Sequence, residues 1–402
     1  MLALGFALAL CVPFRPYALA LRAAEHVSAR TLLLLTGLLM LTGLLVYPAF
    51  GSDLFVYLDY ERLWVVHGVN PLLAAPAMHP EDWAYAFTWI PQQPSPYGPL
   101  WPILTWPIAA LAGEQLWGYI GGYKLLSVLS YVTCCGLVWA SAPDGQRKRQ
   151  LVLFAWSPLV LFEVLGKAHN DALLAVSALG AICLARRDQP VLALLVATAG
   201  ALIKVSGLAV VLALVAWLAH QRRWRDLALG LAGSAVLSTA LYAPFWVGPQ
   251  SLLPIVVQTS RVVWSPGSLL VMLTGDTAAR LILVVGFAAL YLALVRRARP
   301  LPLQSALLLL ATLLLLTTAF FAHYLVPVVA LAAVAGNRRL EHVTLALSLG
   351  SLAAYSVELL AVVFPMGWIG SPGYQVLGSL ITLAPAVVTD RCHASGWLRR
   401  RD

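Results

Sequence analysis

Long apolar segments alternate with short polar ones along the whole chain of 402 residues. The run at 31–50 is long enough to cross, as a helix, a hydrocarbon layer about 30 Å thick. Three other apolar segments, at 192–202, 208–218 and 324–335, fall well short of the ~20 residues that a spanning helix needs. The pattern predicts an all-α, polytopic integral membrane protein with about 12–13 transmembrane helices. The short helices should leave a cavity that water enters from one side of the membrane.

One long polar interval, at 52–99, interrupts this pattern directly after the run at 31–50. It carries five acidic residues, at positions 53, 59, 61, 81 and 82, and a single basic residue other than histidine, Arg62, although the whole chain has a formal charge of +9. We predict that this interval is the first outer loop, at about 51–99, with interfacial helices and the chemistry of the protein. No internal repeat or linker divides the rest, so residues 1–402 are expected to form a single transmembrane domain.

Composition supports the membrane class, because 61% of the residues are hydrophobic and only 11% are charged. Such a composition excludes a water-soluble globule with one core. The five cysteines show no spacing typical of disulfides or metal sites. The chain has no Gly-rich phosphate loop, so no nucleotide site is expected, and we predict no nucleic-acid partner.

Short clusters of basic residues predict which connections face the cytoplasm. The clusters are Arg22 with Arg30, Arg147 to Arg149, Arg186 with Arg187, Arg222 to Arg225, Arg296 to Arg299, Arg338 with Arg339, and Arg391 with Arg399 to Arg401. The outward turns then fall at 52–99, 166–171, 203–206, 248–267, 321–323 and 365–373. This arrangement predicts a multi-pass protein of the cell membrane, with both termini cytoplasmic and the active site on the outer face. Between the first outer loop and the second basic cluster only one crossing fits, so 116–140 should span while 100–113 lies on the outer surface.

The start of the outer loop predicts a helix that carries a carboxylate. In a helix over 53–67, Asp53 and Tyr57 share one face with Tyr60 or Glu61, and further along with Trp64 and His67. Asp53 would emerge at the membrane surface, beside aromatic side chains that can bind hydroxyl groups. The alternative is a solvated interfacial loop without chemistry.

Polar groups at other outward turns are costly in apolar surroundings, so their positions are informative. Lys204 lies between two half-length helices, where it either holds an anion, most simply a phosphate, or extends its ammonium to the membrane surface. The turn at 166–171 holds Lys167, His169, Asn170 and Asp171. His169 and Asp171 alone do not define a metal site, and Asn170 with Asp171 can also cap the following helix.

Two further outward turns carry similar groups. Arg261 can pair with a phosphate through two hydrogen bonds, and Trp264 can stack on a sugar or lie at the interface. His323 and Tyr324 open a short helix, for which an interfacial role is the alternative.

These groups together suit the transfer of a sugar from a lipid-linked phosphosugar. A carboxylate at Asp53 would deprotonate the acceptor hydroxyl as it attacks the anomeric carbon. Lys204, Arg261 or Lys167 would stabilise the lipid phosphate that departs.

A series of short motifs carries a family resemblance. Ser52-Asp53, Tyr57, Gly68, Asn70-Pro71, the run Tyr97 to Leu100, and the run His169 to Asp171 occur in this order over roughly the first half of the chain. The order resembles the polyprenyl-phosphate-mannose-dependent mannosyltransferases of the GT-C superfamily, notably the bacterial α-1,6-mannosyltransferases of lipoglycan synthesis.

The resemblance implies a GT-C-like fold, inversion at the anomeric carbon and Asp53 as the catalytic base. It also implies a polyprenyl-phosphate donor of mannose or another hexose, and a lipid- or glycan-linked hydroxyl as acceptor. Taken with the polar groups at the outward turns, it leads us to expect substrate contacts from Tyr57, Asp59, Tyr60, Asn70, Tyr97, Lys167, His169, Asn170, Asp171, Lys204, Arg261, His323 and Tyr324. We expect no cofactor and no metal, although some members of the superfamily use a divalent ion.

Two functions of other classes remain open on the sequence. Half-length helices and buried cations also serve a transporter or a flippase of lipid-linked sugars. A structural subunit of an envelope-glycan assembly would need only that the helices pack.

Overall fold

In the computed structural model of the protein, the structure describes residues 2–48, 53–143, 145–296, 306, 309–310, 317–360 and 370–394. Every regular element in these ranges is a helix, and the single extended feature is an isolated parallel bridge between Val263 and Ala319. The prediction of an all-α, polytopic membrane protein is therefore confirmed.

The first half of the chain forms the α-helices numbered α1 to α10. They are α1 (Leu2–Cys11), α2 (Phe14–Ala23), α3 (Ala29–Leu45), α4 (Asp53–Val65), α5 (Leu100–Ala112), α6 (Leu116–Ser141), α7 (Arg147–Ala155), α8 (Pro158–Val160), α9 (Asp171–Arg186) and α10 (Pro190–Ile203). A π-helical segment, η4 (Leu161–Gly166), continues α8, and the short 3-10 helices η1 (Ala24–His26), η2 (Pro76–Met78) and η3 (Trp83–Phe87) lie in the loops.

The second half continues with eight longer helices in the part of the chain that the structure describes. They are α11 (Leu208–His220), α12 (Trp224–Tyr242), α13 (Leu253–Ser260), α14 (Pro266–Thr274), α15 (Asp276–Arg296), α17 (Val326–Ala335), α18 (Arg338–Leu360) and α19 (Pro372–Ala394). Short 3-10 helices lie between them, as η5 (Val205–Gly207), η6 (Ala243–Phe245), η7 (Pro249–Leu252) and η8 (Ala322–Leu325).

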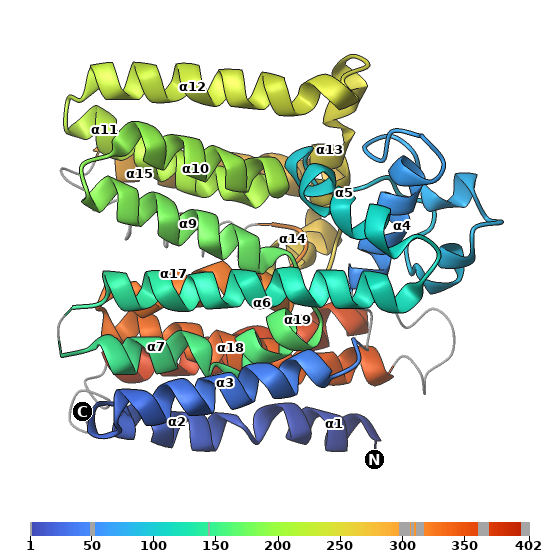
Figure 1. The fold of residues 1–402 in the computed structure, drawn as a ribbon. Coiled ribbons are helices and arrows are strands. Elements are labelled where there is room, and N and C mark those ends of the chain that lie inside the picture. The colour runs from blue at the N-terminus through green and yellow to red at the C-terminus, as the bar shows by residue number, and fades with distance from the viewer. Residues whose placement is uncertain are drawn as a thin grey trace.

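Most of the helices run side by side along one direction, and the first outer loop projects from one end of the bundle (Figure 1). α4 lies within this loop region, whereas the connections between α6 and α7, and between α9 and α10, lie at the opposite end (Figure 1). The long polar interval therefore lies at one end of the bundle and contains helices, while its placement on the outer face stays a prediction.

Four helices in the described residues are long and apolar enough to cross a membrane, namely α6, the helix at Trp224–Phe245, α15 and α18. A fifth is formed if α7 and the segment Pro158–Gly166, which meet at an angle of 44°, make one span. α6 confirms the predicted span at 116–140. Short apolar helices at α10, Val205–His220 and Ala322–Ala335 confirm the three short segments. The total of about 12–13 spans stays a prediction.

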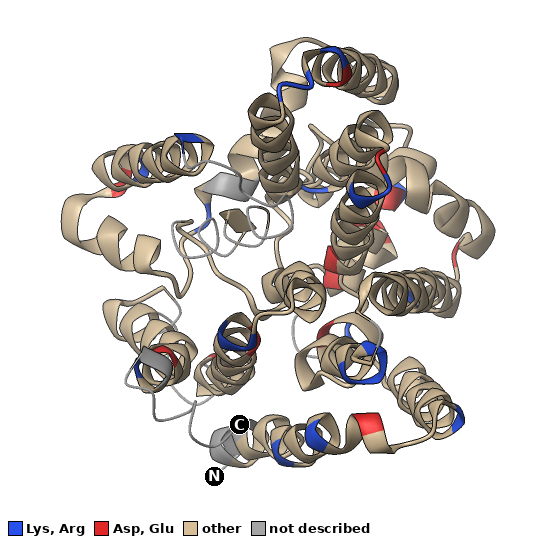
Figure 2. Ribbon diagram, turned by 90° about the vertical axis from the view of Figure 1, so that its left-hand side faces the viewer, with Lys and Arg blue, Asp and Glu red and all other residues tan. Residues whose placement is uncertain are grey.

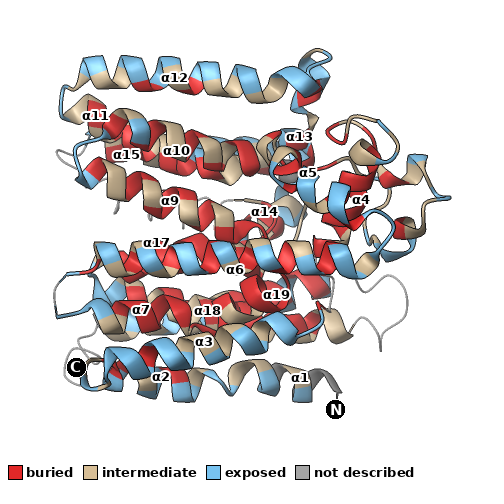
Figure 3. Ribbon diagram, in the orientation of Figure 1, coloured by how far each residue is buried: buried red, intermediate tan, exposed pale blue. Residues whose placement is uncertain are grey.

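Burial divides the helices into an inner and an outer set (Figure 3). α17 is buried along its length, while α12 and α15 expose large apolar side chains such as Val236, Leu281 and Val284. A soluble protein rarely exposes apolar surface on this scale, so these faces are suited to contact lipid.

Basic residues gather at the end of the bundle opposite α4 (Figures 1 and 2). This end holds Arg22 at the end of α2, Arg147 at the start of α7, Arg186 at the end of α9, Arg296 at the end of α15 and Arg338 at the start of α18. α1 begins at the α4 end of the bundle and α19 ends at the basic end (Figure 1). The described ends of the chain therefore lie at opposite ends of the bundle.

Candidate active site

The carboxylate of Asp53 opens α4 and is buried, with 6% of the residue exposed. The hydroxyl of Tyr97 donates a hydrogen bond of 2.9 Å to its Oδ2 atom. Tyr97 is held in place by the next residue, Gly98, whose backbone N–H donates to the carbonyl of Ile203 at 3.0 Å. A Cβ at Gly98 would lie 2.2 Å from the carbonyl oxygen of Leu202, so only glycine allows this approach to the end of α10. These two hydrogen bonds hold the C-terminal end of the outer loop against the start of α4 and the end of α10.

The turn that precedes α9 brings a second group of polar residues to Asp53. The π-helical segment Leu161–Gly166 directly precedes this turn, and Ala168 within the turn takes the left-handed conformation with a φ of 59°. π-Helical turns and left-handed residues other than glycine are unusual and gather at functional sites. The backbone N–H of Asn170 donates to the hydroxyl of Tyr57 at 3.1 Å, which joins this turn to α4.

Asn170 stands at the N-cap position of α9, but its side chain makes no capping hydrogen bond. Its amide is buried, and neither of its polar atoms has a hydrogen-bond partner in the described part of the chain. The side chain lines a small cavity together with Trp101, Tyr123 and His169. A buried amide without partners is costly, so Asn170 is available to a ligand.

His169 is oriented by a network of buried side chains. Its Nδ1 atom lies 2.7 Å from Glu163 Oε2, and the hydroxyl of Tyr355 donates to Glu163 Oε1 at 2.9 Å. Lys167 donates to the same Tyr355 hydroxyl at 2.9 Å and lies 3.9 Å from Glu163 Oε2. The Nε2 atom of His169, on the far side of the ring, is buried and has no hydrogen-bond partner among the described residues.

Lys204 is buried and binds Asp171 through both carboxylate oxygens, at 3.0 and 2.9 Å. Its ammonium also lies 4.2 Å from the centre of the Tyr324 ring, within the range of a cation–π contact. The Nε2 atom of His323 is 3.9 Å from Asp171 Oδ2. The charge of Lys204 is therefore already compensated by a neighbouring carboxylate, and the residue does not reach the surface.

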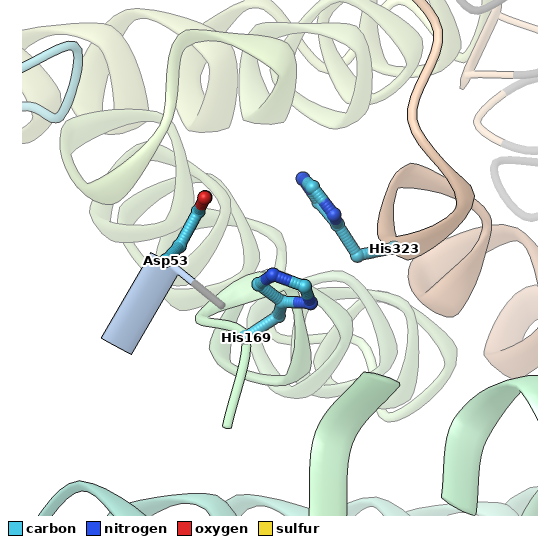
Figure 4. A group of neighbouring side chains, drawn as sticks. All are labelled: Asp53, His169 and His323. Carbon is cyan, nitrogen blue, oxygen red and sulfur yellow. The ribbon is translucent and has the colours of Figure 1, made fainter. Parts of the chain in front are cut away.

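Asp53, His169 and His323 converge on one space from three distant parts of the chain (Figure 4). Each offers one ligand atom, and these atoms lie within 4.8 Å of one another. The two imidazole rings are 4.0 Å apart between centroids. Besides His169 Nε2, the Nδ1 atom of His323 is also buried without a hydrogen-bond partner in the described residues.

This convergence can serve two kinds of chemistry. Two imidazoles and a carboxylate at this spacing match the donor set of a divalent transition metal, and the bond from Glu163 would orient His169 as an outer-shell carboxylate does. The same groups can accept and pass a proton without a metal. The expectation that no metal is needed stays a prediction.

Arg261 completes the charged groups around this space. It follows α13 and is close enough to Tyr324, Tyr97, Asp53 and Tyr60 to interact with them electrostatically. Burial lowers the pKa of Arg261, but the combined electrostatic effect of these neighbours is larger and raises it above the usual value. The guanidinium therefore stays charged. Its Nη2 atom is buried and has no hydrogen-bond partner among the described residues.

Of three other residues predicted as substrate contacts, Asn70 and Tyr60 have protein partners and Asp59 lines another cavity. The side-chain amide of Asn70 donates to the carbonyl of Phe245 at 2.8 Å, and its oxygen accepts from the N–H of Leu72. The hydroxyl of Tyr60 lies 3.0 Å from the carbonyl oxygen of Gln93. Asp59 lines a different cavity, farther along α4. The helical face predicted for α4 is therefore shared among several neighbours, and Asp53 and Tyr57 join the site by hydrogen bonds to Tyr97 and to the N–H of Asn170.

Two buried polar residues next to these groups, Tyr355 and Lys124, were missed from the sequence. Tyr355 lies 192 residues from Glu163, and no local pattern marks it. Lys124, inside the spanning helix α6, donates to the carbonyls of Gly43, Val46 and Gly166 at 3.1, 2.8 and 2.6 Å. A charged residue inside a spanning helix was a signal that could have found it.

Comparison with known proteins identifies the group to which this arrangement belongs. Residues 1–221 match the family described as alpha-(1->6)-mannopyranosyltransferase, N-terminal domain. The chain belongs to this mannosyltransferase family. The match covers more than half of the 402 residues and includes Asp53, the outer loop, the turn before α9 and Lys204. No curated protein matches the chain. The resemblance inferred from the motifs is confirmed, and membership in the mannosyltransferase family supports glycosyltransferase activity.

Proposed function

We propose that the protein transfers mannose, or another hexose, from a polyprenyl-phosphate donor to a hydroxyl group of a lipid- or glycan-linked acceptor, with inversion. The observation that carries the proposal is the meeting of a buried carboxylate, Asp53, with two imidazoles and an unpaired guanidinium nitrogen beneath the outer loop. Membership in the mannosyltransferase family supports the transfer of a sugar.

In the proposed reaction, Asp53 takes the proton of the acceptor hydroxyl. The acceptor oxygen forms a bond to the anomeric carbon while the bond from that carbon to the phosphate oxygen breaks, so the configuration inverts. The polyprenyl phosphate leaves with the bonding electrons, and no nucleotide takes part. A base placed within hydrogen-bond reach of the reacting hydroxyl contributes about 10²–10⁴-fold to the rate.

We infer that Arg261 is the main group that stabilises the departing phosphate. Lys204 and Lys167 are the alternatives, but Lys204 is bound to Asp171, and Lys167 lies beside Glu163 and Tyr355. A guanidinium also matches the geometry of a phosphate with two parallel hydrogen bonds. Lys204 and Lys167 then act by adding positive potential and by holding Asp171 and Glu163 in place.

The remaining polar groups suit the hydroxyls of the sugar. The unpartnered amide of Asn170 can donate and accept, and the aromatic rings of Tyr57, Tyr97 and Trp101 lie together beside Asp53. Tyr324 and His323 would line the opposite side of the same space. Aromatic faces with a few polar groups are typical of sites that bind small polar ligands.

We further propose that the basic end of the bundle faces the cytoplasm and that the α4 end faces outward, in the cell membrane. The gathering of basic residues at one end supports this orientation. The end of α19 would then be cytoplasmic, as expected, but the start of α1 would lie on the outer side. This arrangement of α1 differs from the expectation that both termini are cytoplasmic.

The test is Asp53→Asn in the purified protein in detergent, supplied with synthetic polyprenyl-phosphate mannose and an acceptor. Transfer should fall by about 10²–10⁴-fold. Asp188→Asn, at a carboxylate that is 79% exposed, is the matched control and should keep the parent rate. An unchanged rate for Asp53→Asn would exclude the role of this carboxylate as base.

The same assay separates a transferase from a flippase. Detergent micelles have no two compartments, so a transporter has no measurable activity in them, whereas a transferase still forms the mannosylated product. Failure of the parent protein to form product with any polyprenyl-phosphate hexose would refute the proposed function.

A further inference from the structure

We propose a second site, in the outer loop and separate from Asp53, at which His67, His79 and Glu81 bind a divalent cation of the zinc type, with Asp59 and Asp82 beside it. This proposal does not depend on the proposed function.

The first observation is the convergence of three metal-ligating side chains. His67, His79 and Glu81 each offer one ligand atom, and these atoms lie within 4.8 Å of one another. The two imidazole rings are close but stacked, with centroids 3.9 Å apart, so one ring must turn about its side-chain bonds before both direct a nitrogen at the same ion. His67 follows α4, while His79 and Glu81 follow η2, so the cluster joins two separate segments of the outer loop.

The second observation is a buried carboxylate oxygen at the same place. A cavity is lined by Asp59, Leu63, His67, Pro76, His79 and Asp82. Asp59 is only 5% exposed, and its Oδ2 atom has no hydrogen-bond partner among the described residues. A buried carboxylate oxygen without a partner is costly, and a bound cation would supply the missing interaction.

The charges around this cavity do not balance. Two carboxylates, Asp59 and Asp82, line it, and a third, Glu81, belongs to the cluster with His67 and His79. Arg62 is the one Lys or Arg in the described outer loop at 53–99. Arg62 is already bound to Asp82 at 2.8 Å and to Glu114 at 2.8 Å. The acidic excess of the outer loop is thus concentrated around one small space.

The ligand types select the class of cation. Two imidazoles with carboxylates are typical of zinc, whereas calcium and magnesium prefer oxygen ligands alone. Zinc binds nitrogen and carboxylate oxygen at about 2.0–2.2 Å, so the ligand atoms must draw closer than they are now. Glu81 can make this adjustment because its side chain is 67% exposed, and η2 lies in an irregular part of the loop.

A bound cation would fix the segment at 76–82 to the C-terminal end of α4, because its ligands come from both. In the structure this connection is made at Asp82, which accepts hydrogen bonds from His67 Nε2 at 2.7 Å and from Arg62 at 2.8 Å, while the side chains of His79 and Glu81 bond to each other, at 3.0 Å. A metal would bind both segments at once, in a region that water can reach. The Asp53 cluster lies at the other end of α4, so the two sites can be tested separately.

The experiment measures zinc bound to the full-length protein in detergent. The protein is treated with EDTA, desalted, dialysed against zinc, and analysed by plasma mass spectrometry; magnesium and calcium are tested in the same way. We expect one zinc ion per chain and no retention of magnesium or calcium. His79→Gln and Glu81→Gln should each weaken zinc binding by at least the roughly 10–100-fold that changes around a metal site cost.

Two controls decide where the ion binds. His26→Gln changes an exposed histidine outside both clusters and should bind zinc as the parent does. Asp53→Asn should also keep its zinc. The proposal is overturned if the parent binds no zinc, if His79→Gln and Glu81→Gln bind it normally, or if Asp53→Asn loses it. Glu81 is exposed, so Glu81→Gln still tests the site even if His79→Gln does not fold.

Discussion

The pair of Lys204 and Asp171 gives the sharpest test of how the site is built. Both side chains are almost fully buried, and the ammonium lies 2.9 Å from the nearer carboxylate oxygen. Lys204→Met removes one charge and leaves the other buried, and Asp171→Asn does the reverse. The double variant Lys204→Met/Asp171→Asn removes both charges with little change of shape.

The magnitude follows from the burial of the pair. Two unit charges at this distance attract by roughly 6 kcal/mol at an effective dielectric constant of about 20, and breaking a buried pair costs about 3–5 kcal/mol. Each single variant should therefore be less stable by about 3–5 kcal/mol. The double variant should lose only the ~1–3 kcal/mol of an imperfectly bonded amide, much less than the sum of the single changes.

The assay is thermal unfolding in detergent at a fixed scan rate, because unfolding of such proteins is often irreversible. At about 2 °C per kcal/mol, each single variant should lower the midpoint by about 6–10 °C, and the double variant by a few degrees. Additive losses in the double variant would refute the pairing. A Lys204→Met variant with an unchanged midpoint and a raised KM for the donor would instead show that Lys204 binds the phosphate, as the sequence suggests.

Three further predictions follow from single contacts. Gly98→Ala should abolish transfer and destabilise the outer loop, because a Cβ would meet the backbone of Leu202 at 2.2 Å; normal transfer in this variant would show that the loop does not need this contact. Arg261→Met should raise the KM for the lipid-phosphate donor and lower kcat with little change in the unfolding midpoint, whereas Arg261→Lys should recover part of the rate; a normal rate for the Met variant would exclude Arg261 as the phosphate group. Zinc binding should weaken as the pH falls through about 7, because burial raises the pKa of Asp59 to about 7 and a protonated carboxyl beside the ion no longer attracts it; dialysis at pH 6 and 8 measures this, and equal binding at both would exclude Asp59 as a neighbour of the ion.

The sign of the pH effect on stability differs with and without the ion. The pKa of Asp59 in the folded protein lies above the value of about 3.9 of an exposed aspartate. Without metal, the neutral form is therefore favoured by folding, and its contribution to stability is lost as the pH rises from about 4 through 7. Besides burial, Asp82 raises the pKa of this carboxyl, whereas Thr88 and Arg62 lower it; His67 and His79 line the same cavity. A bound cation removes the loss at high pH because it stabilises the ionised carboxylate.

Much of the fold could be predicted from the sequence because hydropathy and helix length are local properties. α6 stands where one span was expected, and α10, α11 and α17 are short where the apolar segments are short. The position of the interval at 53–99 at one end of the bundle was also predictable, since a long polar interval after an apolar run cannot remain in lipid. The course of α1 was not, because its apolar composition suits either a surface helix or part of a span.

The candidate site was predictable in its parts but not in its pairings. Asp53, His169 and His323 were each marked by a costly polar group at an outward turn, and the structure brings all three together. Lys204 was also marked, but its partner Asp171 depends on how α9 and α10 pack. A sequence records that a buried charge is present, whereas only the packing of distant helices decides which charge neutralises it.

The contacts of the outer loop and those of the ion pair meet at consecutive residues. The loop docks through Gly98 on Ile203, and the residue that follows is Lys204, which holds Asp171 at the start of α9. The Asn170 N–H, one residue earlier, binds Tyr57 of α4, so the connection returns to the helix that begins with Asp53. Because these bonds form a closed path, loosening the loop at Gly98 should disturb the turn before α9 as well as Tyr97. The loop therefore does more than cover the site, since its docking helps to set the positions of Asp53 and His169.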